Sequence, residues 1–552
     1  MLANQTAVVG KETEVQMNSA FQPADWGIFF GYFVVLALTG WWFNRGTIGS
    51  SREFFTGNRH IPTWVIAVSV LATAQSAATF LGAPDYAYRG DLTYLTTNLG
   101  ALAAALFVAH FLLPKFYQYK VTTAYALLQH RFGERSKRHA GMMYLLGRLF
   151  ASGARLYMAA IALSMILFSD IAAAHVLGAI ALLCLVSFAY STWGGIRSVI
   201  YGDAIQCAVY VSAALLVLLY LYWQLPGDGG QILQSLQQPA DGSGNKLRLF
   251  DTGTDLSQAG AFNLLSTFTG FFLLFIASFG LDQDLTQRAL SCRDARQGTW
   301  ALVGSVVLVV PVVTVLLGIG LLLYLFYQDP AYSHQAALTP QNRFAGETIT
   351  VFMFYVLTEL PAGLRGLVTV GVIAAAVSTL TSGLNSMASV LMEDMLKPQL
   401  GERLTQAREV PLARLLMFGL MLALGAMAML CFYWQQYSDT PLLAFALGVM
   451  VFSYSGLLAV FAVALFSQRG NSRSCALALL SGFVLTALQQ PYVQQWYLPT
   501  AWQFDLAFTW QLCIGFILAT LVAYSGKPLA RPDCALPNGS AEVSDECLSA
   551  RN

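Results

Sequence analysis

Thirteen apolar stretches, each long enough to cross a membrane, constrain this chain more than any other feature. A transmembrane helix needs about 20 consecutive apolar residues. Because lipid offers no hydrogen bonds to an open backbone, such stretches fold as helices. They lie near residues 25–43, 63–88, 92–113, 139–168, 172–193, 197–224, 262–281, 299–327, 363–393, 409–433, 440–466, 472–492 and 504–525. The sequence therefore predicts an all-α polytopic membrane protein.

Composition agrees with this class and excludes several others. The chain is 56% apolar and 11% charged, whereas a soluble protein has about a quarter charged residues. A net charge of +1 leaves no basic surface for nucleic acid. The six His lack metal-ligand spacing, the eight Cys include no CxxC pair, and no nucleophile–base constellation is evident. We therefore expect no enzyme, no cofactor and no transition metal.

The basic residues predict how the chain is oriented in the membrane. With thirteen crossings and an outside N-terminus, the inside segments hold 22 Lys and Arg and the outside segments hold 6. Cytoplasmic loops carry such an excess, so we expect a multi-pass plasma-membrane protein. Residues 1–24 form an extracytoplasmic segment without a signal-peptide pattern. Residues 25–525 form the membrane domain, and 526–552 form a cytoplasmic tail.

Hydroxyl side chains cluster in the apolar stretch 374–394 (AAAVSTLTSGLNSMASVLMED). At 3.6 residues per turn, Ala375, Ser378, Thr379 and Ser382 share one helical face. Hard oxygen ligands within the membrane suit a small cation such as Na⁺. A hydroxyl-rich contact between two helices is the alternative.

Asp203, Arg148 and Arg155 are ionisable residues within the expected spans, where charge is costly and usually functional. Asp203 follows Arg197 by six residues, about 9 Å along a helix. It can serve as a cation ligand or pair with a nearby Arg. Arg148 and Arg155 are seven residues apart and share a face. They can clamp a substrate carboxylate, form internal ion pairs or, for Arg148, extend to the interface.

The 63–88 segment has the character of a broken helix. Thr73, Gln75, Ser76 and Thr79 interrupt its apolar run, and Gly82 with Pro84 weakens it further. Exposed backbone carbonyls are tolerated in a membrane only within protein or around a cavity, and they bind Na⁺ in inverted-repeat transporters. An ordinary proline kink is the alternative.

Four motifs in one order resemble those of the sodium/solute symporter family, which includes sugar, proline, sialic-acid, monocarboxylate and iodide carriers. They are SVLATAQSAATFLGAPDYAYR (69–89), TWGGIRSVIYGDAIQ (192–206), DQDLTQR (282–288) and AAAVSTLTSGLNSMASVLMED (374–394). Gly202 departs from the family's usual Thr. The resemblance implies a LeuT-like five-plus-five inverted repeat within a transporter domain. It pairs helices of 63–224 with those of 262–466, with one extra helix before and two after.

The resemblance also implies three sets of binding residues. The first sodium site would use Ala72, Gln75, Ala375, Ser378 and Thr379. A second sodium site would use Asp203, Ser378, Thr381 and Ser382. The substrate would contact Gln75, Ser76, Thr79, Asn98, Arg155 and Tyr157.

These sets predict a sodium-coupled symporter that imports a small organic anion, either sialic acid-like or a monocarboxylate. Sugar-type members use a Glu-Gln pair where this chain has Ala78 and Thr79, which disfavours glucose-like substrates. The alternatives are a sodium-coupled sugar or amino-acid symporter, or a proton-coupled carrier using Asp203. A channel is disfavoured because no filter motif occurs. The expected partners are substrate, Na⁺ and lipid; the oligomeric state stays open.

Overall fold

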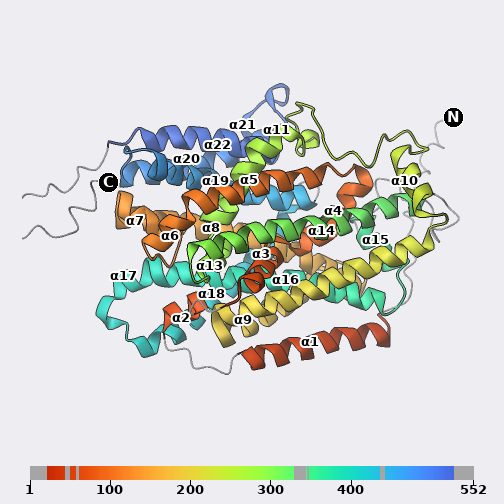
Figure 1. The fold of residues 1–552 in the computed structure, drawn as a ribbon, viewed down its shortest axis with the longest axis horizontal. Coiled ribbons are helices and arrows are strands. Elements are labelled where there is room, and N and C mark those ends of the chain that lie inside the picture. The colour runs from red at the N-terminus through yellow and green to blue at the C-terminus, as the bar shows by residue number, and fades with distance from the viewer. Residues whose placement is uncertain are drawn as a thin grey trace, which may run out of the picture.

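The chain folds into an elongated bundle of helices in a computed structural model (Figure 1). The structure describes residues 21–43, 50–57, 61–328, 343–344, 347–435 and 442–527. Within these ranges the strands form one short antiparallel hairpin, β1 (Arg343–Phe344) with β2 (Glu347–Thr348). The predicted all-α membrane class is confirmed.

The bundle is built from twelve longer helices and ten shorter ones among the described residues. The longer ones are α1 (Pro23–Phe43), α3 (Thr63–Ala74), α4 (Ala77–Arg89), α5 (Thr97–Phe111), α8 (Glu134–Phe168), α9 (Ala173–Gln224), α14 (Ala295–Gln328), α16 (Leu364–Val390), α18 (Gln406–Gln435), α19 (Leu442–Phe466), α20 (Ser472–Leu488) and α22 (Phe508–Tyr524). The shorter ones are α2 (Ser51–Thr56), α6 (Leu113–Gln118), α7 (Ala126–Phe132), α10 (Gly229–Gln237), α11 (Leu264–Ser266), α12 (Phe272–Ile276), α13 (Gln283–Leu290), α15 (Val351–Thr358), α17 (Lys397–Leu400) and α21 (Pro491–Tyr497). Two π-helical stretches, Thr267–Phe271 and Ala277–Leu281, extend α11 and α12 into one span.

These helices fall on the apolar stretches of the sequence. Nine described helical stretches are long and apolar enough to span a membrane, and the bent pair α3–α4 makes a tenth. They coincide with the first ten expected segments. Three shorter apolar helices, Val451–Phe466 within α19, α20 and α22, fall on the last three.

The second expected segment is a broken helix. The axes of α3 and α4 differ by 66°, and the chain between them is extended at Gln75 and Ser76. The break lies at the polar residues and not at Pro84, which sits inside α4. Of the two interpretations of this segment, the proline kink is therefore wrong.

Helix α9 covers two expected spans that meet at a kink. Gly195 has φ 58° and ψ −156°, outside the helical region. A Cβ there would lie 2.5 Å from the carbonyl oxygen of Phe54 in α2. Glycine is therefore required both for the backbone angle and for the close approach of α2.

Helix α16 runs through the middle of the bundle, where it packs against α9, α8, α3 and α18. Figure 1 shows α1 at one edge and α20 with α22 at the opposite edge. Asp25 of α1 caps the start of α16: it accepts hydrogen bonds from the amides of Gly363 and Gly366, both 2.8 Å, and pairs with Arg365 at 3.1 Å. The extra helix α1 is thereby fixed to the central helix.

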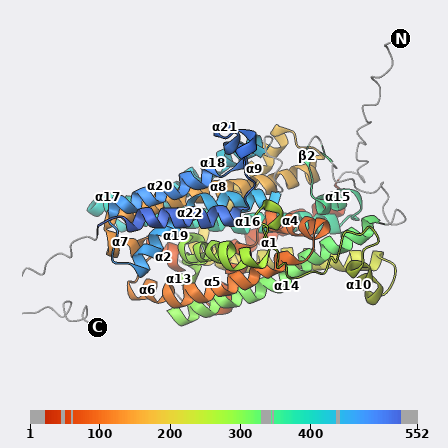
Figure 2. The same ribbon diagram turned by 90° about the horizontal axis from the view of Figure 1, so that it is seen from above.

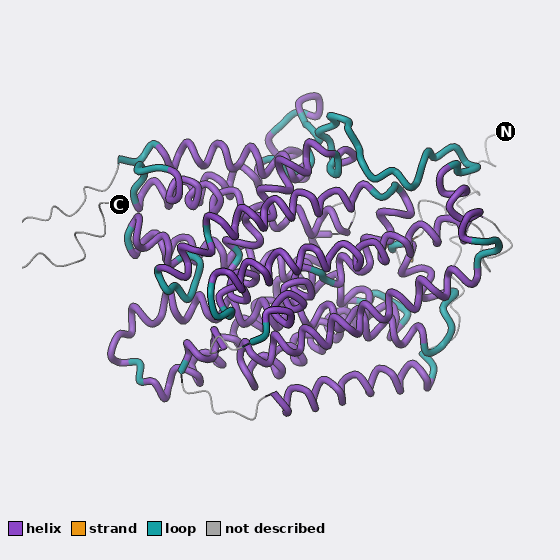
Figure 3. Tube along the Cα trace, in the orientation of Figure 1, coloured by secondary structure: helices purple, strands orange, loops and turns teal. Residues whose placement is uncertain are grey.

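Loops lie at both ends of the bundle (Figure 3), and backbone hydrogen bonds join neighbouring loops. The Leu92 amide donates to the Arg248 carbonyl (3.1 Å) on one side, and the Gly470 amide donates to the Gly526 carbonyl (3.0 Å) on the other. Helix α1 begins and α22 ends at opposite ends of the bundle (Figures 1 and 2). An odd number of crossings is consistent with this arrangement. Residues 1–20 and 528–552, which hold most of the expected terminal segments, lie outside the described residues.

Candidate functional site

The hydroxyl-rich face of α16 meets the chain at the break between α3 and α4. The Thr379 hydroxyl lies 3.0 Å from the carbonyl oxygen of Ala375 and 3.3 Å from that of Gln75, and it can donate to either. Ala72 is buried in the last turn of α3, where the final carbonyls pass beyond the helical hydrogen-bond ladder. Neutral oxygens are thus gathered at the negative end of α3. A small cation prefers ligands of this kind.

Ser378 turns from the same helix to a carboxylate on α9. Its hydroxyl donates to Asp203 at 2.7 Å, and Asp203 also accepts from Ser69 (2.6 Å) and Arg288 (2.7 Å). Both earlier interpretations of Asp203 therefore have a structural counterpart: it meets the α16 hydroxyls and it pairs with an Arg.

The other two residues of the predicted second site have different partners. Thr381 donates to carbonyls of its own helix, at Val377 (2.9 Å) and Ser378 (3.0 Å). Ser382 donates to Asp284 of α13. Three residues of the second set therefore lie on α16, and Asp203 of α9 contacts one of them. Ser382 contacts a further carboxylate, Asp284, that the sequence did not assign to this set.

A network of five buried ionised side chains lies behind these hydroxyls. Arg148 pairs with Asp282 (3.1 Å) and with Asp284, whereas Arg288 pairs with Asp284 (3.1 Å) and Asp203 (2.7 Å). Each of the five is at most 3% exposed in its side chain. Breaking one partner of a buried pair typically costs about 3–5 kcal/mol. The network therefore holds α8, α9 and α13 together rigidly.

Sequence reasoning recognised DQDLTQR as a family motif but missed this network. All eight residues of α13 are buried, so Arg288, which the topology count places in an inside loop, lies within the bundle. The signal available was three charges within seven residues between two apolar spans. Arg148 takes the internal ion-pair role that the sequence left open.

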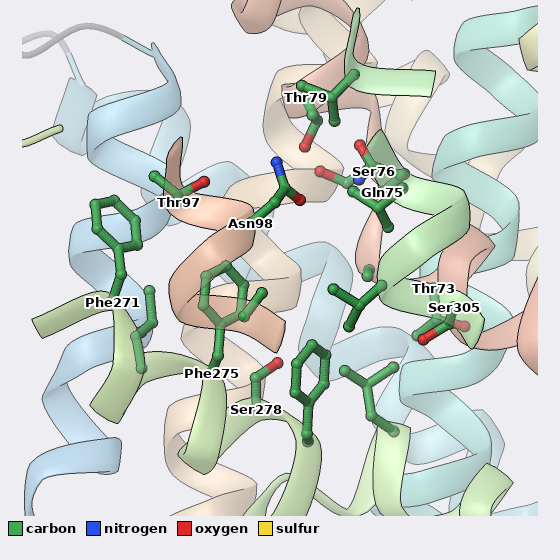
Figure 4. A pocket seen from close by; sticks show the side chains of 18 of the residues that line it. Thr73, Gln75, Ser76, Thr79, Thr97, Asn98, Phe271, Phe275, Ser278 and Ser305 are labelled. Carbon is green, nitrogen blue, oxygen red and sulfur yellow. The ribbon is translucent and has the colours of Figure 1, made fainter. Parts of the chain in front are cut away.

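A cavity of about 110 Å³ lies beside the break and next to this network. Its wall includes five of the predicted substrate residues: Gln75, Ser76, Thr79, Asn98 and Arg155. Figure 4 shows Gln75, Ser76 and Thr79 on one side of Asn98, with Phe275 and Ser278 below it. The Gln75 side-chain oxygen is buried and has no hydrogen-bond partner among the described residues. It is therefore available to a ligand.

One wall of the cavity is aromatic, which the sequence did not indicate. Phe271, Phe275 and Phe279 recur every four residues, and their rings follow one another with centroid distances of 6.1 Å and 5.6 Å. This row faces the hydroxyls and amides of the broken helix and α5. The cavity therefore combines an apolar wall with a polar one, as small-molecule sites do.

Tyr157 lies apart from the other predicted substrate residues. It is buried, and its ring packs against Phe432 of α18 with centroids 6.3 Å apart. It is not among the residues that border the cavity. Arg155, two positions earlier on α8, does border it.

A broken membrane helix that meets a hydroxyl-bearing central helix on one side and borders a ligand-sized cavity with α5, α8 and α14 on the other is typical of a secondary transporter. Comparison with known proteins makes the class specific. The profile of the "Sodium:solute symporter family" matches residues 54–482, and the chain belongs to this family.

Its relatives transport different solutes. The sodium/sialic acid symporter SiaT of Proteus mirabilis is 25% identical over 523 residues, which cover 94% of this chain and 98% of that protein. The sodium/sialic acid symporter NanT of Aliivibrio fischeri is 26% identical over 92% of this chain and 94% of its own. Human sodium-coupled monocarboxylate transporter 2 is 26% identical over 69% of this chain and 60% of its own.

A solved structure shares the fold. The substrate-bound, outward-open Na⁺-coupled sialic acid symporter superposes with a TM-score of 0.75 at 23% identity, covering 91% of this chain and 97% of that one. The LeuT-like architecture expected from the sequence is thereby confirmed. The protein is a sodium-coupled solute symporter and not an enzyme.

Proposed function

We propose that this protein imports a small organic anion together with Na⁺ across the plasma membrane. Residues 25–525 form the transporter domain, the N-terminus lies outside, and residues 526–552 form a cytoplasmic tail. The observation that carries the anion assignment is the position of Arg148 and Arg155 on the cavity wall. Arg binds carboxylates in a bidentate manner, so two arginines on one cavity wall favour an anionic substrate.

The start of α4 supports the same assignment. Helix N-termini favour anions because their first amides are unpaired and the helix dipole is positive there. Ser76 precedes α4 and borders the cavity, and its side chain makes no capping hydrogen bond. An anion in the cavity would therefore meet free amides from α4 together with the arginines of α8.

Sodium would bind on the other side of the break. The proposed first site comprises Ala72, Gln75, Ala375, Ser378 and Thr379, and it is supported by the approach of the Thr379 hydroxyl to two carbonyl oxygens. The proposed second site comprises Asp203, Ser378, Thr381 and Ser382. With a univalent anion as substrate, one Na⁺ per cycle would move no net charge, whereas two would move one charge inward, which gains about 2.3 kcal/mol per 100 mV.

Coupling follows from the shared break. Sodium at the first site ties α16 to the α3–α4 joint and fixes the backbone that carries Gln75, Ser76 and Thr79. Substrate then binds against these residues, Asn98 and Arg155. Tyr157 would stabilise the position of α8 by packing against Phe432 of α18. Because each ligand stabilises the state that binds the other, the coupling is reciprocal.

The size of the cavity favours a short acid. Its volume of about 110 Å³ is below the roughly 150 Å³ of an engineered cavity that holds benzene. A monocarboxylate fits the described conformation, whereas a sialic acid requires the pocket to widen.

Thermal unfolding of the purified protein tests the proposal, because a ligand of the folded state raises the melting temperature. Lactate, N-acetylneuraminate, glucose and proline are each added in NaCl and in KCl. A rise with an acid in NaCl alone supports sodium–anion symport. A rise in melting temperature with glucose or proline would contradict an anionic substrate and indicate a sugar or an amino acid instead. A proton-coupled carrier would show no difference between NaCl and KCl and would take up solute along a pH gradient.

A further inference from the structure

We propose that Asp284 is an internal anion that occupies Arg148 in the empty transporter and passes to the coupling cation when the cation binds, which frees Arg148 for the substrate. This inference rests on the function proposed above and adds a residue and a step to it. Asp284 and Arg148 both border the cavity, so their pairing and the bound substrate compete for the same space.

The geometry of Arg148 shows what the pairing blocks. Nη1 is held by Asp282 at 3.1 Å and Nη2 by Asp284, whereas Nε is buried with no hydrogen-bond partner among the described residues. Nε and Nη2 lie along one edge of the guanidinium group, and that edge matches the two oxygens of a carboxylate. Asp284 uses only half of the edge. A substrate carboxylate can use both donors once Asp284 has moved away.

The other oxygen of Asp284 faces the predicted second cation site. It accepts from Ser382 and from Arg288 Nη1 at 3.1 Å. Ser382 lies one turn after Ser378, whose hydroxyl holds Asp203 at 2.7 Å. Two carboxylates thus meet successive turns of α16, about 6 Å apart along the helix at 1.5 Å per residue. A cation between them would be bound by both hydroxyls and both carboxylates.

Charge supplies the force for the exchange. Asp284 is shared by Arg148, Arg288 and the Ser382 hydroxyl, so its charge is divided between the arginines and α16. A monovalent cation at α16 attracts Asp284. Arg148 then lacks one of its two carboxylate partners, and the substrate anion replaces it. Each ligand creates the charge that the other needs, which is reciprocal coupling.

Sodium alone provides the first arm of the test. NaCl is titrated against choline chloride at constant ionic strength, and the melting temperature is followed for wild type, D284N and D394N. Asp394 is the matched control, because it is a buried carboxylate in the stretch that follows α16, where it binds Thr123 (2.8 Å) and lies 4.0 Å from Lys137, and it does not border the cavity. We expect the half-maximal Na⁺ concentration to rise at least about tenfold in D284N and to stay within about twofold in D394N. A D284N titration that matches wild type overturns the proposal.

Anions provide the second arm, with lactate and N-acetylneuraminate as probes. In wild type either probe should raise the melting temperature in NaCl and not in KCl. In D284N the same probe should also raise the melting temperature in KCl, because Arg148 no longer needs a cation to release it, while Na⁺ at the first site still adds to the rise. A D284N protein that gives no response in KCl overturns the exchange. No response of wild type to either acid overturns the anion function itself, which is a different failure.

If D284N does not fold, a charge-balanced variant allows the sodium titration to test the proposal. The double variant R148Q/D284N removes one charge of each sign and leaves no unpaired arginine at this position. It retains Ser378, Ser382 and Asp203. We expect the same rise of at least about tenfold in the Na⁺ requirement, and a wild-type titration would contradict Asp284 as a cation ligand.

Discussion

Ser378 and Thr379 are neighbours on α16, yet their hydroxyls serve different partners. Ser378 donates to the Asp203 carboxylate at 2.7 Å, whereas Thr379 lies 3.3 Å from the backbone carbonyl oxygen of Gln75 at the helix break. Ser378 belongs to both proposed sodium sites and contacts the carboxylate of the second, whereas its neighbour Thr379 contacts the helix break of the first. A small rotation of α16 would alter both at once.

The Thr379 hydroxyl is the first target for mutation. Thr379→Val keeps the shape of the side chain and removes its oxygen, so we expect the half-maximal Na⁺ concentration for uptake to rise about tenfold, equivalent to about 1.4 kcal/mol of binding free energy. Thr369→Val is the control, because Thr369 is a buried threonine of the same helix whose hydroxyl donates to the Arg365 carbonyl. Equal sodium dependence in both variants would remove Thr379 from the first site.

Asp203→Asn tests whether a second ion is carried. We expect the ratio of Na⁺ to substrate to fall from two to one, because the amide cannot supply the negative charge that the second cation needs. The ratio is obtained by finding, at a clamped membrane potential, the Na⁺ gradient that just balances a fixed substrate gradient across proteoliposomes. The variant should also lose stability by up to about 3–5 kcal/mol, since Arg288 loses one of its two charged partners. A ratio equal to that of wild type would indicate that Asp203 serves only Arg288.

Gly195→Ala tests the kink in α9. The new Cβ would lie 2.5 Å from the Phe54 carbonyl oxygen at a φ of 58°, so we expect a loss of at least about 1–3 kcal/mol, measured as a lower melting temperature. Gly178→Ala in the same helix is the control, because its Cβ would have no heavy atom within 4 Å. If the two alanine variants have the same melting temperature, the kink is not constrained by α2.

Asp25→Ala tests the junction of α1 with α16. It leaves Arg365 and two amides at the start of α16 without their acceptor, and we expect a loss of about 3–5 kcal/mol in unfolding free energy. Asp228→Ala removes an exposed cap from the peripheral helix α10 and should cost only about 1 kcal/mol. The second variant D25A/R365M should recover part of the loss. A D25A protein as stable as D228A would show that the junction contributes little.

Cysteine labelling tests the orientation. A membrane-impermeant maleimide is applied to whole cells that express single variants in a background lacking Cys534 and Cys547; the six described cysteines are buried. We expect G242C, in the loop before α11, to be labelled and G401C, after α17, to be protected. The reverse pattern would place the N-terminus inside.

The sequence was sufficient for the fold and for the position of the helix break. Apolar length located the helices, because the bilayer sets their length irrespective of their neighbours. The polar residues around Gln75 located the break, although Pro84 gave a competing signal. Pro84 is accommodated in α4, where Gly320 of α14 approaches its carbonyl so closely that a Cβ would lie 2.1 Å away. That approach depends on tertiary packing and could not be read from α4 itself.

The network of buried ion pairs could not be predicted from the sequence for a different reason. Arg148 and Asp284 are 136 positions apart, and no periodicity relates them. The motif around Asp284 indicated a turn, and only the burial of α13 within the bundle brings the two side chains together. Tyr157 shows the same limit, since its place on α8 was right but its ring faces α18. Residues that share a helix face could be grouped in advance, whereas partners across helices could not.

Asp25 attaches the peripheral helix α1 to the central helix α16, so α1 should move together with α16. Four described donors converge on this one carboxylate, from Gln22, Gly363, Arg365 and Gly366, so α1 cannot slide along α16 without breaking them. The opposite face of α1 is open, and Leu38 is 58% exposed there. A fluorophore attached at Leu38 would report the displacement of the buried central helix from outside the bundle, during turnover and without a change to any residue that borders the cavity.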